Sequence, residues 1–565
     1  MDPVEDIRHL LHSIYGEEKG NRALEKILPL IENFPRRARQ KQGYFSQEDV
    51  VLITYGDSLC KQGEMPLVSF YDFAKHYLKG AISAIHFLPF FPYSSDDGFS
   101  VMDFHSINPE LGSWEDVNAI GQDFQLMLDY VVNHFSSQGK WFENYLAGKE
   151  GFETFAIEAD PAVDLSMVTR PRTLPLLTEY RKQDGQTVHL WTTFSADQID
   201  FNFKNLDVLE KMIDVLLLYV KQGATMLRLD AIAYLWKELD TTCIHLKQTH
   251  DMVKLFRKIL DIVAPEVMII TETNVPHEEN ISYFGNGRDE AQMVYNFSLP
   301  PLLFYSFIKQ DATVLSNWAK GLLLDADTTT FFNFTASHDG IGVRPLEGIL
   351  PPEDINDLIA TVEAAGGQVS YKKNSDGSDS PYELNITYVD AILADQESEQ
   401  AEKFLASQAV QYALPGVPAT YIHSLLGSRN WYEGVRQTGR ARTINREKLA
   451  AEEIVSALGN PNSFRSRVFS AYIHLIKVRK KQPAFHPNAP FDILDIDPKV
   501  FIIKRQTEDQ TIYALTNLSS QRVHFLLSDA GISGPVTELL TDETVDTMEY
   551  ELKPYQYAWL TPSDR

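Results

Sequence analysis

Eight short apolar segments, separated by stretches with helical spacing, are the feature that most constrains the fold of this chain. Most of them are apolar on both faces, as strands of a parallel sheet are when helices cover both sides. Eight strand–helix units predict an α/β chain folded as a (β/α)8 TIM barrel, with a doubly wound sheet as the alternative. The segments lie at 50–57, 84–90, 124–134, 224–234, 266–274, 293–297, 329–339 and 417–424.

Two of the connections between these segments are much longer than one crossover helix requires. Because long loops at the carboxyl ends of barrel strands usually build the substrate site, we expect inserted segments there. A helical stretch precedes the barrel, and short β-like runs follow it. The expected division is an N-terminal helical extension (1–47), the barrel (48–134 and 204–487), two insertions (135–203 and 341–395) and a C-terminal β-domain (488–565).

The charge of the chain argues against polyanionic partners. Its formal net charge is −27 at pH 7, whereas nucleic acids and anionic membranes are bound through basic patches. The chain has only two cysteines, Cys60 and Cys243, and it contains no apolar run of about 18 residues or more. We therefore expect a cytoplasmic protein that acts on small molecules and binds neither nucleic acid nor a membrane.

The run MLRLDAIAYLW at 226–236 places two charges in an otherwise apolar segment. Side chains alternate along a strand, so Arg228 and Asp230 point the same way. A buried charge is costly unless it is paired or used. Any single polar residue at a strand end is readily explained as a turn former or helix cap, but several on one rim of a barrel predict a site. Polar residues follow the other predicted strands at Asp96, His134, Glu272, His338 and Asp339.

Glycosyl transfer is the chemistry that suits these groups, because it needs one ionised carboxylate and one protonated carboxylic acid. Asp230, beside an arginine, is expected to have a lowered pKa and to be the nucleophile. Glu272 follows the apolar run VMII, so we expect desolvation to raise its pKa and to suit it as the acid/base. Asp339 would stabilise positive charge on the sugar, and His134 and His338 would donate hydrogen bonds to sugar hydroxyls.

Four short motifs, in this order and at these spacings, resemble those of the α-amylase family: DYVVNH, RLDAIAY, TETN and ASHDG. The resemblance implies that Asp230 is the nucleophile, Glu272 the acid/base and Asp339 the transition-state stabiliser. It also implies a reaction that retains the anomeric configuration through a β-glucosyl-enzyme. The insertions and the C-terminal segment are similar to the B, B′ and C parts of that family.

A more specific resemblance extends over nearly the whole chain. The stretches LITYGD, HFLPFFPYSSDDGF, SWEDV, RPRTLP, HDGIGV and PYELNITY are similar to the sucrose phosphorylase branch of that family. In that branch phosphate, rather than water, takes the glucose and α-D-glucose 1-phosphate is released. The resemblance implies that Asp96 and Phe99 hold and stack on the glucosyl ring and that Arg442 closes this subsite; Arg228 is a further expected substrate-binding residue. It places Arg172, Tyr234 and Tyr382 on the phosphate or acceptor side.

Two departures from the sucrose phosphorylases concern the acceptor. Asn274 stands where they typically have His, and Glu383 stands where they have Gln. The N-terminal extension and the stretches CIHLKQTH, TNVPHEENISYFG and SPYE resemble instead the glucosylglycerate phosphorylases of the branch. This implies D-glycerate as acceptor, with sucrose, sucrose 6′-phosphate and glucosylglycerol as alternative substrates. Arg172 could hold phosphate and the glycerate carboxylate in turn, whereas Glu383 would repel an anion if it pointed inward.

Other classes of function stay open on the sequence alone. A hydrolase on the same scaffold would share every catalytic residue, and a non-catalytic sugar-binding barrel would be expected to have lost one of the three carboxylates. His245 and His250 are five residues apart rather than four, so no helical metal pair is indicated. We expect neither metal nor cofactor. The expected partners are an α-glucoside, inorganic phosphate and α-D-glucose 1-phosphate, and a homodimer is one option for the assembly.

Overall fold

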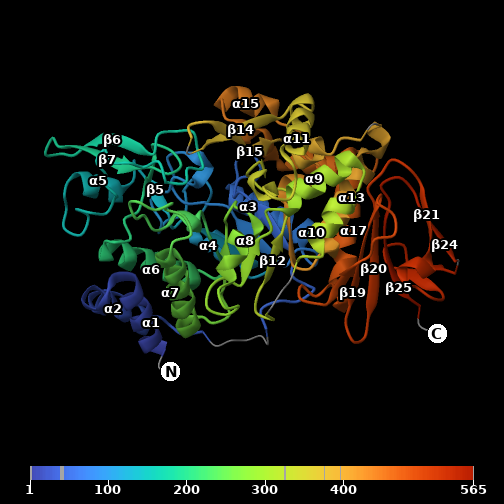
Figure 1. Cartoon of the computed structure of the whole chain (residues 1–565), viewed down its shortest axis with the longest axis horizontal. Coiled ribbons are helices and arrows are strands. Elements are labelled where there is room, and N and C mark those ends of the chain that lie inside the picture. The colour runs from blue at the N-terminus through green and yellow to red at the C-terminus, as the bar shows by residue number, and fades with distance from the viewer. Residues whose placement is uncertain are drawn as a thin grey trace.

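Eight parallel strands close into a barrel at the centre of the molecule (Figure 1). A computed structural model describes residues 3–37, 43–322, 326–374, 376–394, 396–546 and 548–563. Each predicted apolar segment contains one barrel strand, so the barrel prediction is confirmed and the doubly wound alternative is wrong. In spatial order the strands are β1 (Val51–Thr54), β16 (Val417–Tyr421), β12 (Thr330–Asn333), β11 (Met293–Tyr295), β10 (Met268–Thr271), β9 (Ala224–Leu229), β4 (Gln125–Tyr130) and β3 (Ala84–Phe87).

The barrel helices form where apolar residues recur at spacings of three and four. In α7 (Lys247–Val263), Met252, Phe256, Ile259 and Val263 are buried on one face, which is the stripe expected of a helix packed on a sheet. The neighbouring helix α6 (Leu206–Lys221) starts at Asn205, whose side chain accepts a hydrogen bond from the Asp207 N–H. Apolar burial thus sets the outer layer, and side-chain caps set where a helix begins.

The N-terminal extension consists of two helices, α1 (Pro3–Tyr15) and α2 (Glu17–Glu32), which lie against α6 and α7 (Figure 1). The buried face of α1 comprises Ile7, Leu11 and Ile14. Ion pairs flank this face, for example Lys258 with Asp6 at 3.0 Å. The extension is therefore packed onto the barrel by an apolar face.

Both long connections carry secondary structure of their own. After β4, the chain forms β5 (His134–Ser136), α5 (Lys140–Leu146), the hairpin of β6 (Leu177–Arg181) and β7 (Thr187–Trp191), and then β8 (Gln198–Asp200), which pairs with β5. After β12 come β13 (Ile341–Gly342), α11 (Pro352–Ala364), β14 (Gln368–Lys373) and β15 (Asp379–Asn385), and these three strands form one sheet. Both insertions lie along the upper side of the view in Figure 1, away from α1 and α2.

The C-terminal segment is built of β-strands, at the far right of Figure 1. Six of them form an antiparallel sheet in the order β18 (Phe491–Ile493), β19 (Val500–Gln506), β20 (Thr511–Asn517), β25 (Tyr557–Pro562), β22 (Val536–Glu538) and β23 (Glu543–Val545). A further pair, β21 (Val523–Leu526) with β24 (Glu549–Leu552), shares a separate apolar core with that sheet. The division into domains stays a prediction, and residues 1, 2, 38–42, 323–325, 375, 395, 547, 564 and 565 of its segments lie outside the described ranges. None of the helices that the structure describes is long and apolar enough to cross a membrane.

Candidate active site

A cavity at the carboxyl ends of the barrel strands gathers the polar residues that the sequence singles out. Apart from Tyr234, every residue proposed for the site lines it. Tyr234 packs edge-on against Phe194, with ring centroids 5.5 Å apart, so it stands behind a lining residue. The cavity is lined by Asp96, Phe99, His134, Arg172, Phe194, Gln198, Arg228, Asp230, Ala231, Glu272, Asn274, Phe297, His338, Asp339, Gly340, Tyr382, Glu383 and Arg442.

The buried guanidinium of Arg228 contacts several carboxylates at once. The register of β4 and β9 places Asp129 opposite Arg228, and Arg228 Nη1 donates to this carboxylate and, at 2.8 Å, to Asp230 Oδ1. Arg228 Nη2 lies 3.7 Å from Glu272 Oε2. On the far side, His86 Nε2 is 2.7 Å from Asp129 Oδ2. The arginine in the core strand is therefore paired, and it anchors the carboxylates of two neighbouring strand ends.

Glu272 keeps its proton more firmly than an exposed glutamic acid. Burial raises its pKa, and the charge of Asp339 acts in the same direction, whereas Arg228 and a hydrogen bond from the Ala231 N–H at 3.0 Å oppose the shift. The predicted raised pKa of Glu272 is confirmed. This is the environment that suits a general acid.

The expectation for Asp230 was wrong in direction. Burial raises the pKa of Asp230 well above its usual range, and the negative charges of Glu272 and Asp129 raise it further. Arg228 lowers this pKa, but by less than the other effects raise it. Asp230 and Glu272 titrate as a pair, and a protonated Glu272 no longer repels the charge of Asp230. Because Asp230 has the shorter contact to Arg228, the shared proton belongs on Glu272 and the negative charge on Asp230.

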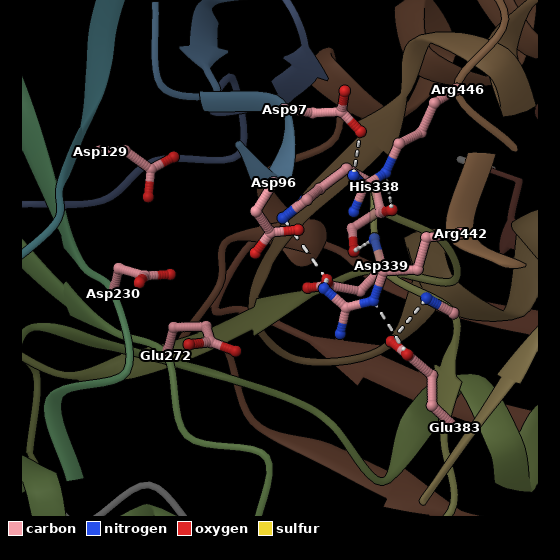
Figure 2. Close-up of polar contacts among 12 residues, drawn as sticks. Asp96, Asp97, Asp129, Asp230, Glu272, His338, Asp339, Glu383, Arg442 and Arg446 are labelled. Carbon is pink, nitrogen blue, oxygen red and sulfur yellow. Dashed lines mark hydrogen bonds and ion pairs between the residues drawn. The ribbon is translucent and has the colours of Figure 1, made fainter. Parts of the chain in front are cut away.

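Asp339 belongs to a second ion-pair network on the opposite side of the cavity (Figure 2). Arg442 Nη1 lies 2.6 Å from Asp339 Oδ1, and Arg442 Nε donates to Glu383 Oε2 at 3.0 Å. Glu383 also accepts the Gly340 N–H at 2.8 Å. Although burial acts against it, Arg442 holds the pKa of Asp339 below its usual range. Glu383 thus points inward, and its charge is paired with Arg442.

The turn that carries Asp96 and Phe99 is held from two sides. Asp96 and Asp97 adopt left-handed φ values of 54° and 48°, which are uncommon for residues with a side chain. Asp197, from the first insertion, accepts hydrogen bonds from serines 94, 95 and 137, and Arg446 Nη1 pairs with Asp97 at 2.5 Å. The ring of Phe99 stacks on another lining side chain, the His338 imidazole, 4.8 Å between centroids.

The two histidines of the site are differently engaged. His134 Nε2 lies 3.0 Å from the carbonyl oxygen of Phe99 and 3.1 Å from Gln198 Nε2. Burial lowers the pKa of His338 well below its usual range. Its Nδ1 is buried without a hydrogen-bond partner among the described residues. A neutral His338 therefore has a ring nitrogen free for a ligand, whereas His134 already contacts the main chain.

The side of the cavity that the sequence predicts for the acceptor carries a cation. The guanidinium of Arg172 lies over two rings, 5.3 Å from the centroid of Tyr382 and 5.9 Å from that of Phe194. Asn274 Oδ1 is buried without a hydrogen-bond partner in the part of the chain that the structure describes. A Cβ atom added to Gly342 would come within 2.7 Å of this oxygen, so the glycine leaves room for Asn274.

Sequence reasoning missed several lining residues, among them Phe194, Gln198 and Phe297. Phe297 ends the apolar segment 293–297, so the rule that sites lie at the carboxyl ends of strands could have found it. Phe194 and Gln198 lie in the insertion, where no periodic pattern marks them. Within the described ranges, no group of three or more His, Cys, Asp or Glu side chains is placed to hold a metal ion.

Comparisons with known proteins agree with this geometry. Residues 75–339 match the family model of the α-amylase catalytic domain. The crystal structure of a sucrose 6F-phosphate phosphorylase from Thermoanaerobacter thermosaccharolyticum superposes with a TM-score of 0.74 at 25% identity, over 85% of this chain and 95% of that one. A glucosylglycerate phosphorylase from Spirochaeta thermophila is 46% identical over 100% of this chain and 99% of its own. The chain belongs to the sucrose phosphorylase-like branch of the α-amylase family.

A second member of this branch, a glucosylglycerate phosphorylase from Escherichia coli, is 44% identical over 98% of this chain and 99% of its own. Both of these relatives therefore match the insertions and the N-terminal extension as well as the barrel. The extension is thus shared with relatives named for glucosylglycerate.

Proposed function

We propose that this protein is a retaining α-glucoside phosphorylase that acts on 2-O-α-D-glucosyl-D-glycerate. It would convert this glucoside and inorganic phosphate reversibly into α-D-glucose 1-phosphate and D-glycerate. The observation that carries the proposal is full-length identity of 44–46% to proteins named glucosylglycerate phosphorylase. A cavity that combines paired carboxylates with Arg172, a cation that has no ion-pair partner among the described residues, supports the same assignment.

The first half of the reaction would form a glucosyl-enzyme. Glu272 gives its proton to the glycosidic oxygen as the bond to the anomeric carbon breaks, and Asp230 attacks that carbon from the opposite face. Asp339, kept ionised by Arg442, stabilises positive charge that develops on the ring. The proposed contacts of the glucosyl ring are Asp96, Phe99, His134, His338 and Arg442, and Arg228 holds Asp230 in place.

In the second half, phosphate would take the place that glycerate leaves. An oxygen of hydrogen phosphate attacks the anomeric carbon, the bond to Asp230 breaks, and Glu272 recovers a proton from phosphate. Two inversions retain the configuration, as expected of double displacement. Phosphate and the glycerate carboxylate are both anions, so one cationic subsite can serve them in turn.

Arg172 is the proposed centre of that anion subsite, with Tyr382 and Asn274 beside it. Its guanidinium lies over two aromatic rings. Within the part of the chain that the structure describes, no carboxylate pairs with it, so its donors can bind a planar or tetrahedral anion. Glu383 faces the same cavity but is paired with Arg442, and this pairing reduces its repulsion of an anion. Tyr234 does not line the cavity, so it would affect acceptor binding indirectly, through its packing against Phe194.

An acceptor panel tests the proposed substrate. The protein is incubated with α-D-glucose 1-phosphate and D-glycerate, glycerol, fructose or fructose 6-phosphate at equal concentration, and phosphate release is measured. We expect the fastest release with D-glycerate. Faster release with fructose or glycerol would assign the chain to the sucrose- or glucosylglycerol-acting members, and release that is independent of any acceptor would make it a hydrolase.

Replacement of Arg172 tests the shared subsite. Arg172→Ala should weaken phosphate and D-glycerate together, by about 1.5–3 kcal/mol each, because a hydrogen bond from a charged donor is lost from both. The matched control is Arg181→Ala, an exposed arginine of the same insertion. The measurement is the KM of each anion, and a change in only one of them would contradict a shared subsite.

Three further assignments accompany the proposal. We infer a cytoplasmic enzyme that works on small molecules, with the insertions and the C-terminal β-domain divided as the sequence predicts. A homodimer stays a prediction, which light scattering at several protein concentrations would check.

A further inference from the structure

An outer cavity adjoins the active site and differs from it in charge. The two share Asp96, Arg172, Phe194, Gln198, Glu383 and Arg442. The inner cavity is lined by five carboxyl groups and three arginines, whereas the outer one is lined by two carboxylates and four arginines. In a chain of net charge −27, the mouth of the site is therefore basic and its floor acidic. An anion is favoured at the mouth and disfavoured on the floor.

Two of the four arginines at the mouth are neutralised by the chain itself. Arg442 is paired with Asp339 and Glu383, and Arg446 with Asp97. Arg172 and Arg440 have no carboxylate within ion-pair distance among the described residues. Arg172 and Arg440 are thus the cations of the outer cavity that are left for a ligand, whereas the lining carboxylate of Asp96 accepts a hydrogen bond from Gln198.

A hydroxyl donor is also available in the outer cavity. Three serines line it, and two of them are already engaged as donors, Ser95 to Asp197 and Ser195 to Gln198. Ser370, on β14 of the second insertion, instead accepts a hydrogen bond from Asn385 Nδ2 at 2.9 Å. No acceptor for its own O–H proton lies among the described residues, so the hydroxyl can donate to a ligand.

We propose that Arg440, Ser370 and Arg172 form an outer binding site for a small oxyanion. The cavity volume of 340 Å³ falls within the range of ordinary small-molecule sites, roughly 300–1,000 Å³. The chemistry fits inorganic phosphate and the glycerate carboxylate alike. This role rests on the proposed function. The outer site holds the incoming anion while the leaving anion departs past Arg172, which lines both cavities.

Direct binding of inorganic phosphate to the free enzyme tests the site without turnover. In calorimetric titrations at low salt, Arg440→Gln should raise the phosphate Kd about threefold or more, as expected for loss of a partly exposed charge pair. Arg440→Lys should restore most of the affinity, and Ser370→Ala should weaken binding by a smaller factor. Separate titrations with D-glycerate decide which anion the site takes.

The matched control is Arg436→Gln, which removes the same charge from an exposed arginine four residues away that is paired with Glu433. Arg436→Gln should bind phosphate as the wild type does. The difference between the Arg440 and Arg436 variants should shrink from about 0.01 M to about 1 M salt, where the Debye length falls from about 30 Å to about 3 Å.

Equal Kd values for wild type, Arg440→Gln and Arg436→Gln would overturn the outer site, as would an equal loss in both variants. These outcomes differ from a failure of the proposed function. If phosphate binding depends on Arg440 but no α-D-glucose 1-phosphate is formed from any α-glucoside, the proposed reaction fails and the outer site stands. If glucose 1-phosphate is formed while Arg440→Gln binds phosphate normally, the proposed reaction stands and the outer site fails.

Discussion

One positive charge in the core of the barrel lies beside the carboxyl groups that we propose to be catalytic. Arg228 is 1% exposed and contacts Asp129, Asp230 and Glu272. Burial raises the pKa of both Asp230 and Glu272, so this pair holds a proton more firmly than exposed carboxyl groups do. The contact distances assign that proton to Glu272, which is the arrangement that double displacement requires at the start of the reaction.

Asp230→Asn should remove the covalent step. We expect a loss on the order of 10⁴-fold or more in the rate of phosphorolysis, because this side chain forms the bond to the sugar. Asn is nearly isosteric and can still accept a hydrogen bond from Arg228, so the unfolding midpoint should change little. The rate and the thermal midpoint are measured together, and activity within tenfold of wild type would refute the nucleophile assignment.

The raised pKa of Glu272 has a consequence for pH dependence. If Glu272 is the general acid, its protonated form is the active one for glycoside cleavage. The value of kcat/KM should then fall as the pH rises through this pKa, at a higher pH than for ordinary glutamic acid. Glu272→Gln should abolish cleavage of natural glucosides. It should form the glucosyl-enzyme from α-glucosyl fluoride with less loss, since fluoride leaves without protonation. An equal loss on both substrates would exclude an acid role.

The sequence showed that Arg228 lies beside Asp230, but it did not show that Asp129 shares the same guanidinium. Arg228 is two residues away, whereas Asp129 is 99 residues from Arg228 and binds the same nitrogen. Only the barrel register brings them together. The pKa of Glu272 was predictable because its burial follows from the apolar strand that precedes it.

At the scale of elements, the turn at residues 94–100 depends on a side chain from another segment. Asp197 Oδ1 accepts from Ser137 at 2.6 Å, and its main-chain oxygen accepts from Ser100 at 3.0 Å, in addition to the contacts with Ser94 and Ser95. Two consecutive left-handed aspartates are unfavourable by themselves. The first insertion therefore holds the turn that presents Asp96 and Phe99, the residues proposed to contact the glucosyl ring.

Asp197→Ala should loosen this turn. We expect the KM for α-D-glucose 1-phosphate to rise about tenfold or more, since several hydrogen bonds to a charged acceptor are lost, each of about 1.5–3 kcal/mol. Glu179→Gln, an exposed site on β6 of the same insertion, is the control and should leave KM unchanged. A purely structural role would instead lower the unfolding midpoint with KM unaffected.

The strands were predictable because burial on both faces leaves a continuous apolar run in the sequence. The site was predictable where its residues follow those runs, as at Glu272 and Asp339. The Asp197 contacts were not, because serine and aspartate carry no periodic signal and the partners lie about a hundred residues apart in the chain. Insertions meet the barrel through such contacts, so their side chains are assigned only by the folded structure.

For the whole molecule, the N-terminal helices act as a packed layer at a distance from the cavity mouth. Tyr15, at the end of α1, donates to the carbonyl of Phe203 at 2.8 Å and packs edge-on against Trp236, with ring centroids 5.9 Å apart. Trp236 follows Tyr234 by two residues. The extension thus supports the segment after β9 from outside the barrel.

Leu11→Ala should destabilise the protein without changing its chemistry. Leu11, on the buried face of α1, is fully buried, and truncation of such a side chain costs about 2–5 kcal/mol. We expect a lower denaturation midpoint and an unchanged KM for phosphate at low temperature. His9→Ala, exposed on the same helix, should leave the midpoint in place. A midpoint unaltered by Leu11→Ala would show that the extension is not part of the cooperative fold.

The ion pairs that join Glu383 to Arg442 and Arg442 to Asp339 bear on how such an enzyme can be redesigned. A substitution at Glu383 chosen to admit a new acceptor also removes the charge opposite Arg442, and Arg442 then acts on Asp339 alone. A change that alters the choice of acceptor would therefore also alter the stabilisation of the glucosyl group. A library of variants directed at a new acceptor would have to vary Glu383 and Arg442 jointly. Natural divergence at Glu383 would need a paired change at Arg442, or an intermediate sequence with an uncharged residue at one of the two positions.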